Sequence, residues 1–565
     1  MEQPQRIFGD DFRRNQGNQA RRYNLLAASL IADIVKGFLG PRGMAKMFVD
    51  ILGETTITKN GATFLRKIDV EHPAAKLMIE ASNAVNNAVG DGTTSAIVLA
   101  GGLVKKADEL LVSGISPMLI AEGYSQALGI SLDFLERLSQ KTSNSDRQIL
   151  TELAKTCLKS KLIQLDGIQE SAANIVVDAI VTISDFQNNS VDIDSIKIEE
   201  KIGKPSDSIL VRGVVIDKTI DSPVMPRTIR NAKILLIDVE LENKRMRGDA
   251  EVRFDSHQDF QSFLIGMSDS LKRMIQVIIE SGANVVISRK GISLLAQSIL
   301  SKSNIVSIKR IKENDLLWIE KSTGAKITND LSINSLRSSL GYAGHVHESL
   351  VGEDKMVFIE ECINPKAVTI LLRSSSKAIL DEFHRSVLDT IHVLQNYIAK
   401  PLIVYGGGSL EAVIANKIRK IANVTGSRKQ LVLEKFAVVL EEIPLTIARN
   451  AGMDQLNTIT ELRSKVSKHC DGKLAWYGIN AIDRKVDDMR SMMVIEPAAV
   501  KEQALKTAVE VTSLLIRVDD VLIKKQVLNT HTHLDGTTHS HSGGNKKHDH
   551  FDRLGKQQRP MHHYY

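Results

Sequence analysis

Residues 89–95 read Val-Gly-Asp-Gly-Thr-Thr-Ser, and this stretch is the most informative part of the chain. An apolar helical pattern follows from Ala96 to Leu111. The first N–H groups of a helix have no partner inside it and can hold phosphate oxygens. A carboxylate such as Asp91 can hold the metal ion that accompanies a polyphosphate. A glycine-rich turn that only caps the helix fits these residues equally well, so the wider sequence has to decide.

The overall composition indicates a protein of several domains. With 565 residues the chain is too long for one hydrophobic core, and roughly two to four domains are expected. It has no apolar run long enough to span a bilayer, and the polar N-terminus leads us to expect no secretory signal. Three widely spaced cysteines are typical of a protein of the reducing cytoplasm. The net charge of +6 and the 4% aromatic content do not favour nucleic acid as a partner.

Helical patterns dominate the two ends of the chain. Apolar residues recur at helical spacing from Leu26 to Phe38, and the next helical patterns cover residues 72–89, 93–113 and 118–138. Two short β-prone runs, 47–50 and 55–58, predict a hairpin. From about residue 380 to 522 the pattern is helical again.

The middle of the chain alternates strands with helices. Helical patterns cover residues 256–281 and 292–301. The β-prone runs are residues 209–217, 233–239, 284–288 and 305–308. This alternation predicts an α/β domain inserted into the helical part.

The C-terminal segment, residues 527–565, has a different composition. It is polar and holds eight of the fifteen histidines: His531, His533, His539, His541, His548, His550, His562 and His563. Such a segment cannot bury enough apolar surface to fold alone, which predicts a disordered tail. The paired histidines could bind Zn²⁺, Ni²⁺ or Cu²⁺, and a mobile polar tail is the alternative.

Four clusters could assemble one nucleotide site. They are the turn at 39–43, the strand and turn at 56–63, the loop at 90–95 and the consecutive glycines 406–408. Lys59 could meet a phosphate as a point charge. Taken singly, the clusters also fit a helix cap, a hairpin loop, a capped helix and a flexible linker. Asp389 lies in a helical stretch, where a solvated acid is the ordinary interpretation.

Ordered motifs along about nine-tenths of the chain make it resemble a group II chaperonin subunit, of the family of the archaeal thermosome and of the eukaryotic cytosolic chaperonin. The matches run from about Asn18 to Lys524. They include residues 39–41, 60–63, 71–76, 89–95, 98–101, 364–367, 406–408, 450–454 and 518–521.

The resemblance implies a multidomain chaperonin fold. Residues 1–144 and 400–526 would form a mostly α-helical equatorial domain that binds ATP. Residues 145–211 and 365–399 would form a small α/β intermediate domain. Residues 212–364 would form an α/β apical domain that contacts client protein, with a helical protrusion at about 245–280 as a lid. In that protrusion Phe260, Leu264, Met267, Leu271, Met274 and Ile278 recur at helical spacing, and for much of the helix they are expected to be core.

The resemblance also implies roles for single residues. Asp91 would hold Mg²⁺, and Asp389 would orient or deprotonate the attacking water. The expected catalytic residues are Asp389, Asp91 and Asn60. Lys161 would sense the γ-phosphate and Glu496 would accept the ribose hydroxyls. The expected nucleotide contacts are Leu39, Gly40, Pro41, Lys59, Gly61, Gly90, Asp91, Gly92, Thr93, Thr94, Ser95, Lys161, Gly407, Gly408, Asn480 and Glu496.

One departure from the family pattern concerns the chemistry. Asn60 stands where the family usually has an aspartate near the metal ion and the water. Because an amide cannot accept a proton, we expect hydrolysis to be slower than in relatives, while binding survives. Milder departures, which suggest a diverged paralogue, are Arg42, Ala45, Tyr405 and Ser374.

Two functions follow from the resemblance. The first is a cytoplasmic chaperonin subunit that uses ATP and Mg²⁺ to enclose non-native proteins in a double ring of identical or paralogous subunits. The second is a scaffold subunit of a mixed ring that binds ATP and barely hydrolyses it. Asn60 favours the second, whereas Asp91, Asp389 and Lys161 together favour the first. A stand-alone kinase or phosphatase has little support, since no second substrate site is visible.

Overall fold

The computed structural model describes residues 12–161, 168–242, 257–363, 365–468, 476–524, 529–532 and 538–541. They fall into two compact units, one from the two ends of the chain and one from Asn24 to Arg517. In the first unit, β1 (Phe12–Gln16) pairs antiparallel with β21 (Asp520–Lys524). Two described parts of the tail, β22 (Asn529–Thr532) and β23 (Thr538–His541), pair antiparallel. The remaining tail positions lie outside the described residues.

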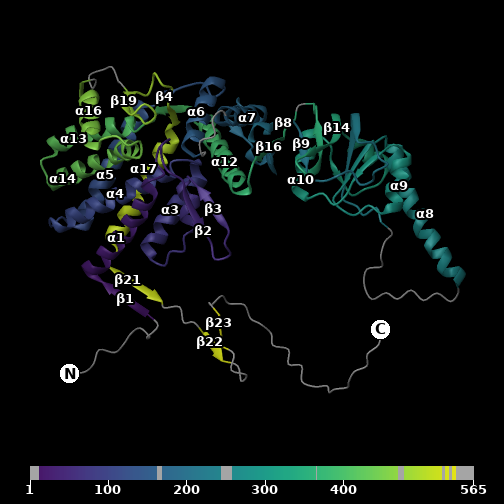
Figure 1. Ribbon diagram of the computed structural model, residues 1–565, viewed down its shortest axis with the longest axis horizontal. Coiled ribbons are helices and arrows are strands. Elements are labelled where there is room, and N and C mark those ends of the chain that lie inside the picture. The colour runs from purple at the N-terminus through teal and green to yellow at the C-terminus, as the bar shows by residue number, and fades with distance from the viewer. Residues whose placement is uncertain are drawn as a thin grey trace. The chain divides into compact units, whose positions relative to one another are not determined.

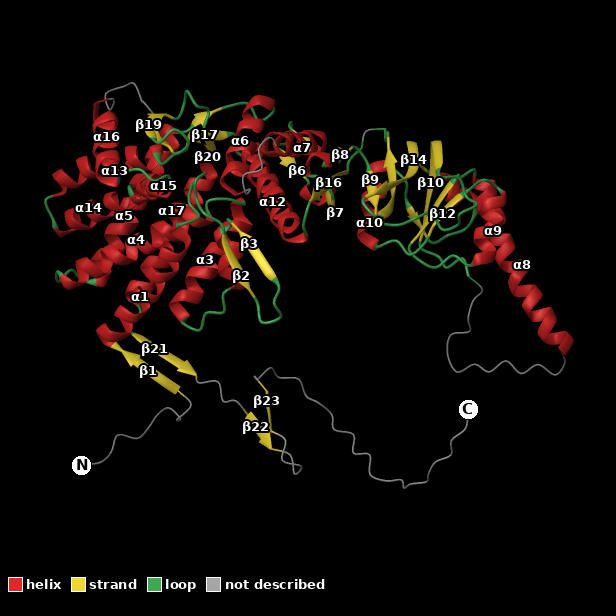
Figure 2. Ribbon diagram, in the orientation of Figure 1, coloured by secondary structure: helices red, strands yellow, loops and turns green. Residues whose placement is uncertain are grey.

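Most of the second unit is a group of helices around one hydrophobic core (Figures 1 and 2). Helix α17 packs against α3, α4 and α5, so segments far apart in the sequence build the same core. The helices are α1 (Gly17–Lys36), α2 (Gly61–Lys67), α3 (Pro73–Val89), α4 (Thr93–Val112), α5 (Pro117–Leu138), α13 (Ser409–Thr425), α14 (Arg428–Leu440), α15 (Glu442–Asn450), α16 (Gln455–Lys468) and α17 (Ala498–Arg517).

Local sequence signals explain where these helices begin. Pro73 and Pro117 occupy the first turns of α3 and α5, where the missing N–H costs nothing. The Ser116 hydroxyl accepts the N–H of Leu119 as an N-cap. The helices predicted for residues 72–89, 93–113 and 118–138 are confirmed to within one residue at each end.

Short strands interrupt this helical part. The predicted hairpin is present as β2 (Lys46–Val49) and β3 (Thr55–Thr58). The expectation of helix throughout 380–522 is wrong at several places, because strands this short leave no periodic signal. These strands are β17 (Leu402–Tyr405), β18 (Tyr477–Asn480), β19 (Lys485–Asp488) and β20 (Ile495–Pro497). β17 lies between β20 and β4 (Gln140–Lys141), and β18 pairs with β19.

A second group of elements surrounds a three-stranded sheet. In it β16 (Val368–Ser374) runs parallel to β7 (Ile196–Ile202) and antiparallel to β8 (Ile209–Val211). The helices are α6 (Arg147–Lys161), α7 (Ile168–Ile183) and α12 (Lys377–Ala399), and the short turns and strands are β5 (Ser184–Asp185), β6 (Ser190–Val191), η1 (Ile193–Ser195) and η2 (Pro205–Asp207).

The inserted α/β part is built on a seven-stranded mixed sheet with its own core (Figure 2). Its strands are β9 (Val214–Ile216), β10 (Thr228–Ile237), β11 (Val285–Ser288), β12 (Val306–Ile308), β13 (Ile327–Thr328), β14 (Gly341–Val351) and β15 (Asp354–Glu360). Its helices are α8 (His257–Ser281), α9 (Leu294–Lys302), α10 (Glu313–Thr323) and α11 (Ile333–Ser338). The alternation of strands and helices predicted for the middle of the chain is therefore confirmed.

The single β-prone run predicted at 209–217 is two strands that belong to different sheets. β8 ends at Val211 and β9 begins at Val214. Between them Gly213 has φ +155°, and a Cβ there would lie 1.9 Å from the carbonyl oxygen of Ile359. Only glycine allows so close a backbone approach, and the chain changes sheet at this point.

The segment predicted as a lid is described only from His257 onward. Residues 245–256 lie outside the described residues, as do the side chains of Phe260, Leu264 and Met267. Leu271 and Ile278 are buried in the core of the seven-stranded sheet, and Met274 packs against it, as the pattern predicts. This end of α8 is therefore part of the α/β core.

Candidate functional site

A cavity of about 230 Å³ lies where the distant motifs meet. Nearly all the predicted contacts line it, although they come from segments hundreds of residues apart. The lining includes Leu39, Gly40, Pro41, Lys59, Asn60, Gly61, Asp91, Gly92, Thr93, Thr94, Ser95, Lys161, Gly407, Gly408, Asn480 and Glu496. The two remaining predicted residues, Gly90 and Asp389, do not line it and instead contact Lys161, which does.

The glycines at 90 and 92 hold the loop that leads into α4. Gly90 ends α3 at φ +72° and Gly92 precedes α4 at φ +79°. A Cβ on Gly90 would lie 2.5 Å from the Cβ of His392, and one on Gly92 would lie 2.8 Å from Val500. Both positions therefore need glycine, and the loop brings the start of α4 to the cavity. The N–H groups of residues 93–95 have no partner within the helix and can bind an anion.

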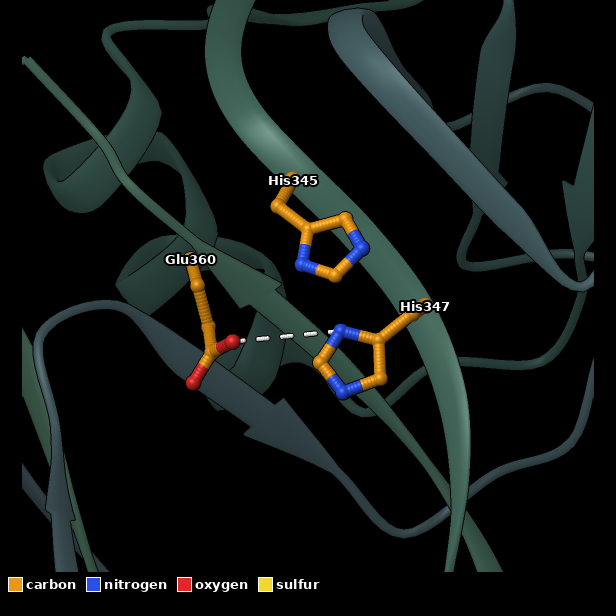
Figure 3. A group of neighbouring side chains, drawn as sticks. All are labelled: His345, His347 and Glu360. Carbon is orange, nitrogen blue, oxygen red and sulfur yellow. Dashed lines mark ion pairs between the residues drawn. The ribbon is translucent and has the colours of Figure 1, made fainter.

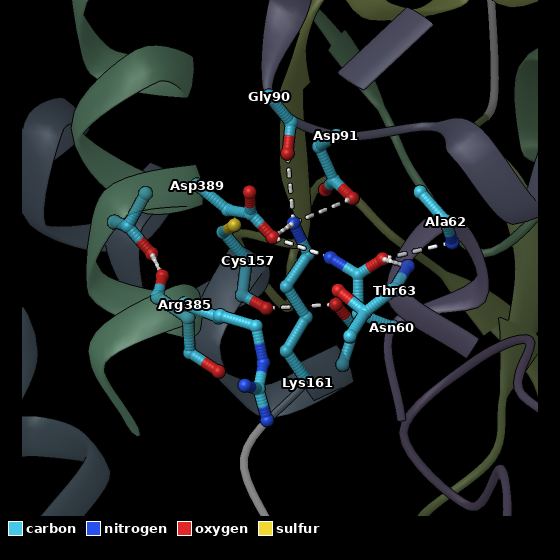
Figure 4. A network of polar contacts seen from close by, with 12 residues as sticks. Asn60, Ala62, Thr63, Gly90, Asp91, Cys157, Lys161, Arg385 and Asp389 are labelled. Atoms are coloured by element: carbon cyan, nitrogen blue, oxygen red, sulfur yellow. Dashed lines mark hydrogen bonds and ion pairs between the residues drawn. The ribbon is translucent and has the colours of Figure 1, made fainter. Parts of the chain in front are cut away.

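Asn60 joins the N-terminus of α2 to the buried acid of α12. Its Oδ1 accepts the N–H groups of Ala62 and Thr63, so the amide nitrogen faces the other way. Nδ2 then donates to Oδ2 of Asp389 over 2.6 Å (Figure 4). Asp389 is only 5% exposed, so the interpretation of it as a solvated acid is wrong.

Lys161, at the end of α6, is the centre of a buried polar cluster (Figure 4). Its Nζ donates to Oδ2 of Asp389 and to the Gly90 carbonyl oxygen, each over 2.8 Å, and lies 3.3 Å from Oδ1 of Asp91. Burial alone would lower the pKa of Lys161, but the two carboxylates outweigh it and raise that pKa. Lys161 is therefore a permanent cation at this edge of the cavity.

The same surroundings affect the carboxyl group of Asp389. Burial raises its pKa, the Lys161 cation works in the opposite direction, and the Asp91 charge raises it further. The net effect is a pKa above the usual range for aspartate. Such a shift suits a group that accepts a proton near neutral pH. The nearby Cys157 thiol is buried, which raises its pKa to about 12 and makes it a poor nucleophile.

The three consecutive glycines form a packed turn after β17, which excludes the flexible-linker interpretation. Gly407 and Gly408 have φ of +63° and +74°. A Cβ on Gly407 would lie 2.6 Å from Sδ of Met489, and one on Gly408 would lie 2.7 Å from Pro444. The backbone of this turn can therefore approach a ligand closely.

A second buried ion cluster, which the motifs did not indicate, holds Glu496. Nζ of Lys501 lies 2.8 Å from Oε2 of Glu496 and 3.0 Å from Oε1 of Glu411. Burial raises the pKa of Glu496, while the Lys501 cation lowers it. The sequence gives little indication of this cluster. Lys501 lies on α17, one helical turn after Pro497, and Glu411 lies on α13 outside any motif.

One side of the remaining lining is apolar and includes Ile443, Ile447, Ile479, Met489 and Met492. Polar side chains of α6 line the cavity as well: Glu152, Lys155, Thr156, Lys159 and Ser160. Asn480 also lines the cavity, and its side-chain amide is held by Asp483. Nδ2 of Asn480 donates to the Asp483 carboxylate, and Oδ1 accepts the N–H of Asp483. A cavity with an apolar side, a helix N-terminus and acidic groups can hold a planar base, a phosphate chain and ribose hydroxyls.

Comparison with known proteins identifies the family. The model of the TCP-1/cpn60 chaperonin family matches residues 31–526. The chain is 40% identical to thermosome subunit alpha of Aeropyrum pernix over 92% of its own length and 94% of that protein. It is 41% identical to thermosome subunit alpha of Sulfurisphaera tokodaii (92% and 94%), and 40% identical to thermosome subunit beta of Archaeoglobus fulgidus (93% and 95%). The chain belongs to the TCP-1/cpn60 chaperonin family, and the resemblance to a group II chaperonin subunit is confirmed.

No helix in the described ranges combines the length and the apolar character needed to cross a membrane.

Proposed function

We propose that the chain is an ATP-hydrolysing subunit of a double-ring chaperonin that encloses non-native proteins in the cytoplasm. The observation that carries the proposal is the contact of Lys161 with Asp389, Asp91 and the Gly90 carbonyl oxygen beside the cavity. Three distant segments meet there, as conditional hydrolysis requires. Membership of the chaperonin family and the identity to thermosome subunits support the ring and the client proteins.

In this proposal the domains have the predicted bounds. The equatorial domain is residues 1–144 and 400–526, the intermediate domain 145–211 and 365–399, and the apical domain 212–364. The change of sheet at Gly213 supports the boundary between the last two. The lid at about 245–280 and the tail at 527–565 remain predictions.

The mechanism follows from the positions of the charged groups. The N–H groups at the start of α4 and the Lys161 ammonium would bind phosphate oxygens and neutralise their charge. Asp91 lines the cavity and its side chain is 29% exposed, so it fits a ligand of Mg²⁺, which would add positive charge at the phosphates. Asp389 would accept the proton of the attacking water. Because it lies on α12 and the phosphate groups bind at α4, hydrolysis depends on how these elements approach each other.

A second candidate function is a ring subunit that binds ATP and hydrolyses it very slowly. The neutral amide of Asn60 favours it, since no proton acceptor stands at that position. Single-turnover hydrolysis of ATP by the assembled protein distinguishes the two. Turnover that Asp389→Ala abolishes supports the ATPase; binding without turnover supports the scaffold; and no binding of adenine nucleotide overturns both.

A further inference from the structure

A group of three metal-binding side chains lies on the seven-stranded sheet, and none of them lines the nucleotide cavity. His345 and His347 belong to β14, and Glu360 ends β15. One ligand atom from each lies within 4.8 Å of the others. Figure 3 shows the carboxylate of Glu360 beside both imidazole rings.

The strand register produces this arrangement. Side chains at positions i and i+2 of a strand lie on the same face, so the sequence His-Val-His places both rings together. Glu360 is directly opposite His345 across the antiparallel pair. Residues opposite each other on one face have Cβ atoms only about 4.5–5.5 Å apart. Val346, between the histidines, points into the core instead.

The two rings are held in position by stacking. The rings of His345 and His347 have centroids 4.4 Å apart and an interplanar angle of 19°. The Phe358 ring also stacks on His347, with centroids 5.1 Å apart and an interplanar angle of 14°. These two stacked neighbours restrict rotation of the His347 ring, whose Nδ1 is directed toward Glu360.

One buried nitrogen of the group, Nδ1 of His347, has no hydrogen-bond partner within the described part of the chain. It lies 3.8 Å from Oε2 of Glu360, which is too long for a hydrogen bond (Figure 3). A buried polar nitrogen without a partner is costly, so each such atom needs an explanation. A cation between the nitrogen and the carboxylate would satisfy both.

The donor set matches a particular class of metal ion. Two imidazoles and one carboxylate are ligands that zinc takes at about 2.0–2.2 Å, which puts ligand atoms roughly 3.4 Å apart around a tetrahedral ion. The 3.8 Å between His347 and Glu360 is near that value, and small side-chain rotations would close the longer separations. Mg²⁺ and Ca²⁺ prefer oxygen ligands and are not favoured. Arg230 is opposite His345 on β10, but it is exposed, so water screens its charge.

We propose that His345, His347 and Glu360 bind one divalent transition-metal ion of the zinc class, with a fourth coordination position open to water or to an external donor. Three protein ligands and an open position are common for zinc sites that exchange a ligand. The side chains of His347 and Glu360 are 23% and 33% exposed, so the site lies near the protein surface, although Nδ1 of His347 itself is buried.

The test must separate this site from the histidines of the tail. The parent is therefore the full-length chain in which the eight tail histidines are replaced by glutamine. Equilibrium dialysis against Zn²⁺ should give one bound ion per chain. His347→Ala and Glu360→Gln should each weaken binding at least about tenfold. His384→Ala is the matched control, because His384 pairs with Glu200 on another sheet and should leave binding unchanged.

The unfolding temperature is a second measurement, which distinguishes loss of zinc binding from misfolding of a variant. Zn²⁺ should raise the unfolding temperature of the parent, because a ligand that binds only the folded state stabilises it. It should not do so for Glu360→Gln, which keeps the size of the side chain. If the parent binds no zinc at micromolar concentration, or if both variants bind as the parent does, the proposal is wrong.

Discussion

Nδ2 of Asn60 donates to Oδ2 of Asp389 over 2.6 Å, and this contact joins the cap of α2 to the acid of α12. The amide of Asn60 donates a hydrogen bond to Asp389 at a position where the family resemblance implies a second acid. An aspartate at position 60 would face the Asp389 carboxylate directly, and two buried carboxylates so close cannot both be ionised without a cation between them.

Asn60→Asp should therefore raise the rate of ATP hydrolysis, by roughly 10-fold and only with Mg²⁺, because it adds a proton acceptor beside the water. The measurement is single-turnover hydrolysis at several Mg²⁺ concentrations. Asn60→Ala serves as the control: it removes the cap, which costs about 1 kcal/mol of stability, and should not accelerate turnover. An unchanged rate in Asn60→Asp would count against the proposed role of position 60.

Asp389→Ala should lower turnover about 10²–10⁴-fold, which is the usual contribution of a general base. Affinity for ATP should change little, because Asp389 does not line the cavity. The check combines single-turnover rates with equilibrium binding of a nucleotide. Asp381→Ala, on the same helix, is the control and should hydrolyse ATP normally. Full activity of Asp389→Ala would exclude it as the base.

Lys161→Met should move the acid limb of the pH–rate profile to higher pH. Asp389 must be ionised to accept a proton, so turnover falls as the pH drops through its pKa. Burial has already raised that pKa, and Lys161 opposes the rise. Without the lysine the pKa of Asp389 rises further, and turnover is lost at a higher pH than in the wild type. A shift of the acid limb to lower pH would contradict this account of the cluster.

Lys501→Met should destabilise the protein by about 3 kcal/mol at neutral pH, because it leaves the buried Glu411 and the partly buried Glu496 without their cation. The pKa of Glu496 is already raised by burial and would rise further without Lys501. An acid whose pKa is higher in the folded state favours folding at low pH, so the stability of the variant should recover as the pH falls. Denaturant unfolding at pH 5 and pH 8 measures this difference. The exposed pair of Lys506 with Glu502 supplies a control, since Lys506→Met should cost no more than about 0.5 kcal/mol.

Gly408→Ala should weaken nucleotide binding and destabilise the fold by about 1–3 kcal/mol, since a Cβ would meet Pro444 and φ is +74°. Gly129→Ala is matched to it: a Cβ there has open space, and the residue is inside α5. That variant should gain up to about 1 kcal/mol and bind normally. Nucleotide titration and thermal unfolding of both variants give the comparison. Equal binding by the two variants would show that the Gly406–Gly408 turn does not approach the ligand.

The sequence by itself determined the helices, the inserted α/β part and most residues around the cavity. Local signals can be recognised in the sequence without knowledge of the fold. They include the periodic apolar positions, helix caps such as Ser116 and motifs such as residues 89–95. The tertiary structure alone decided that the run 209–217 divides between two sheets at Gly213, because the cause is a backbone contact with Ile359. It also decided which polar groups lie together: Lys501 with Glu411, Asn60 with Asp389, and Glu360 with His345 and His347. These pairs come from elements far apart in the chain or from strand register, and burial and charge coupling exist only once those elements have packed together.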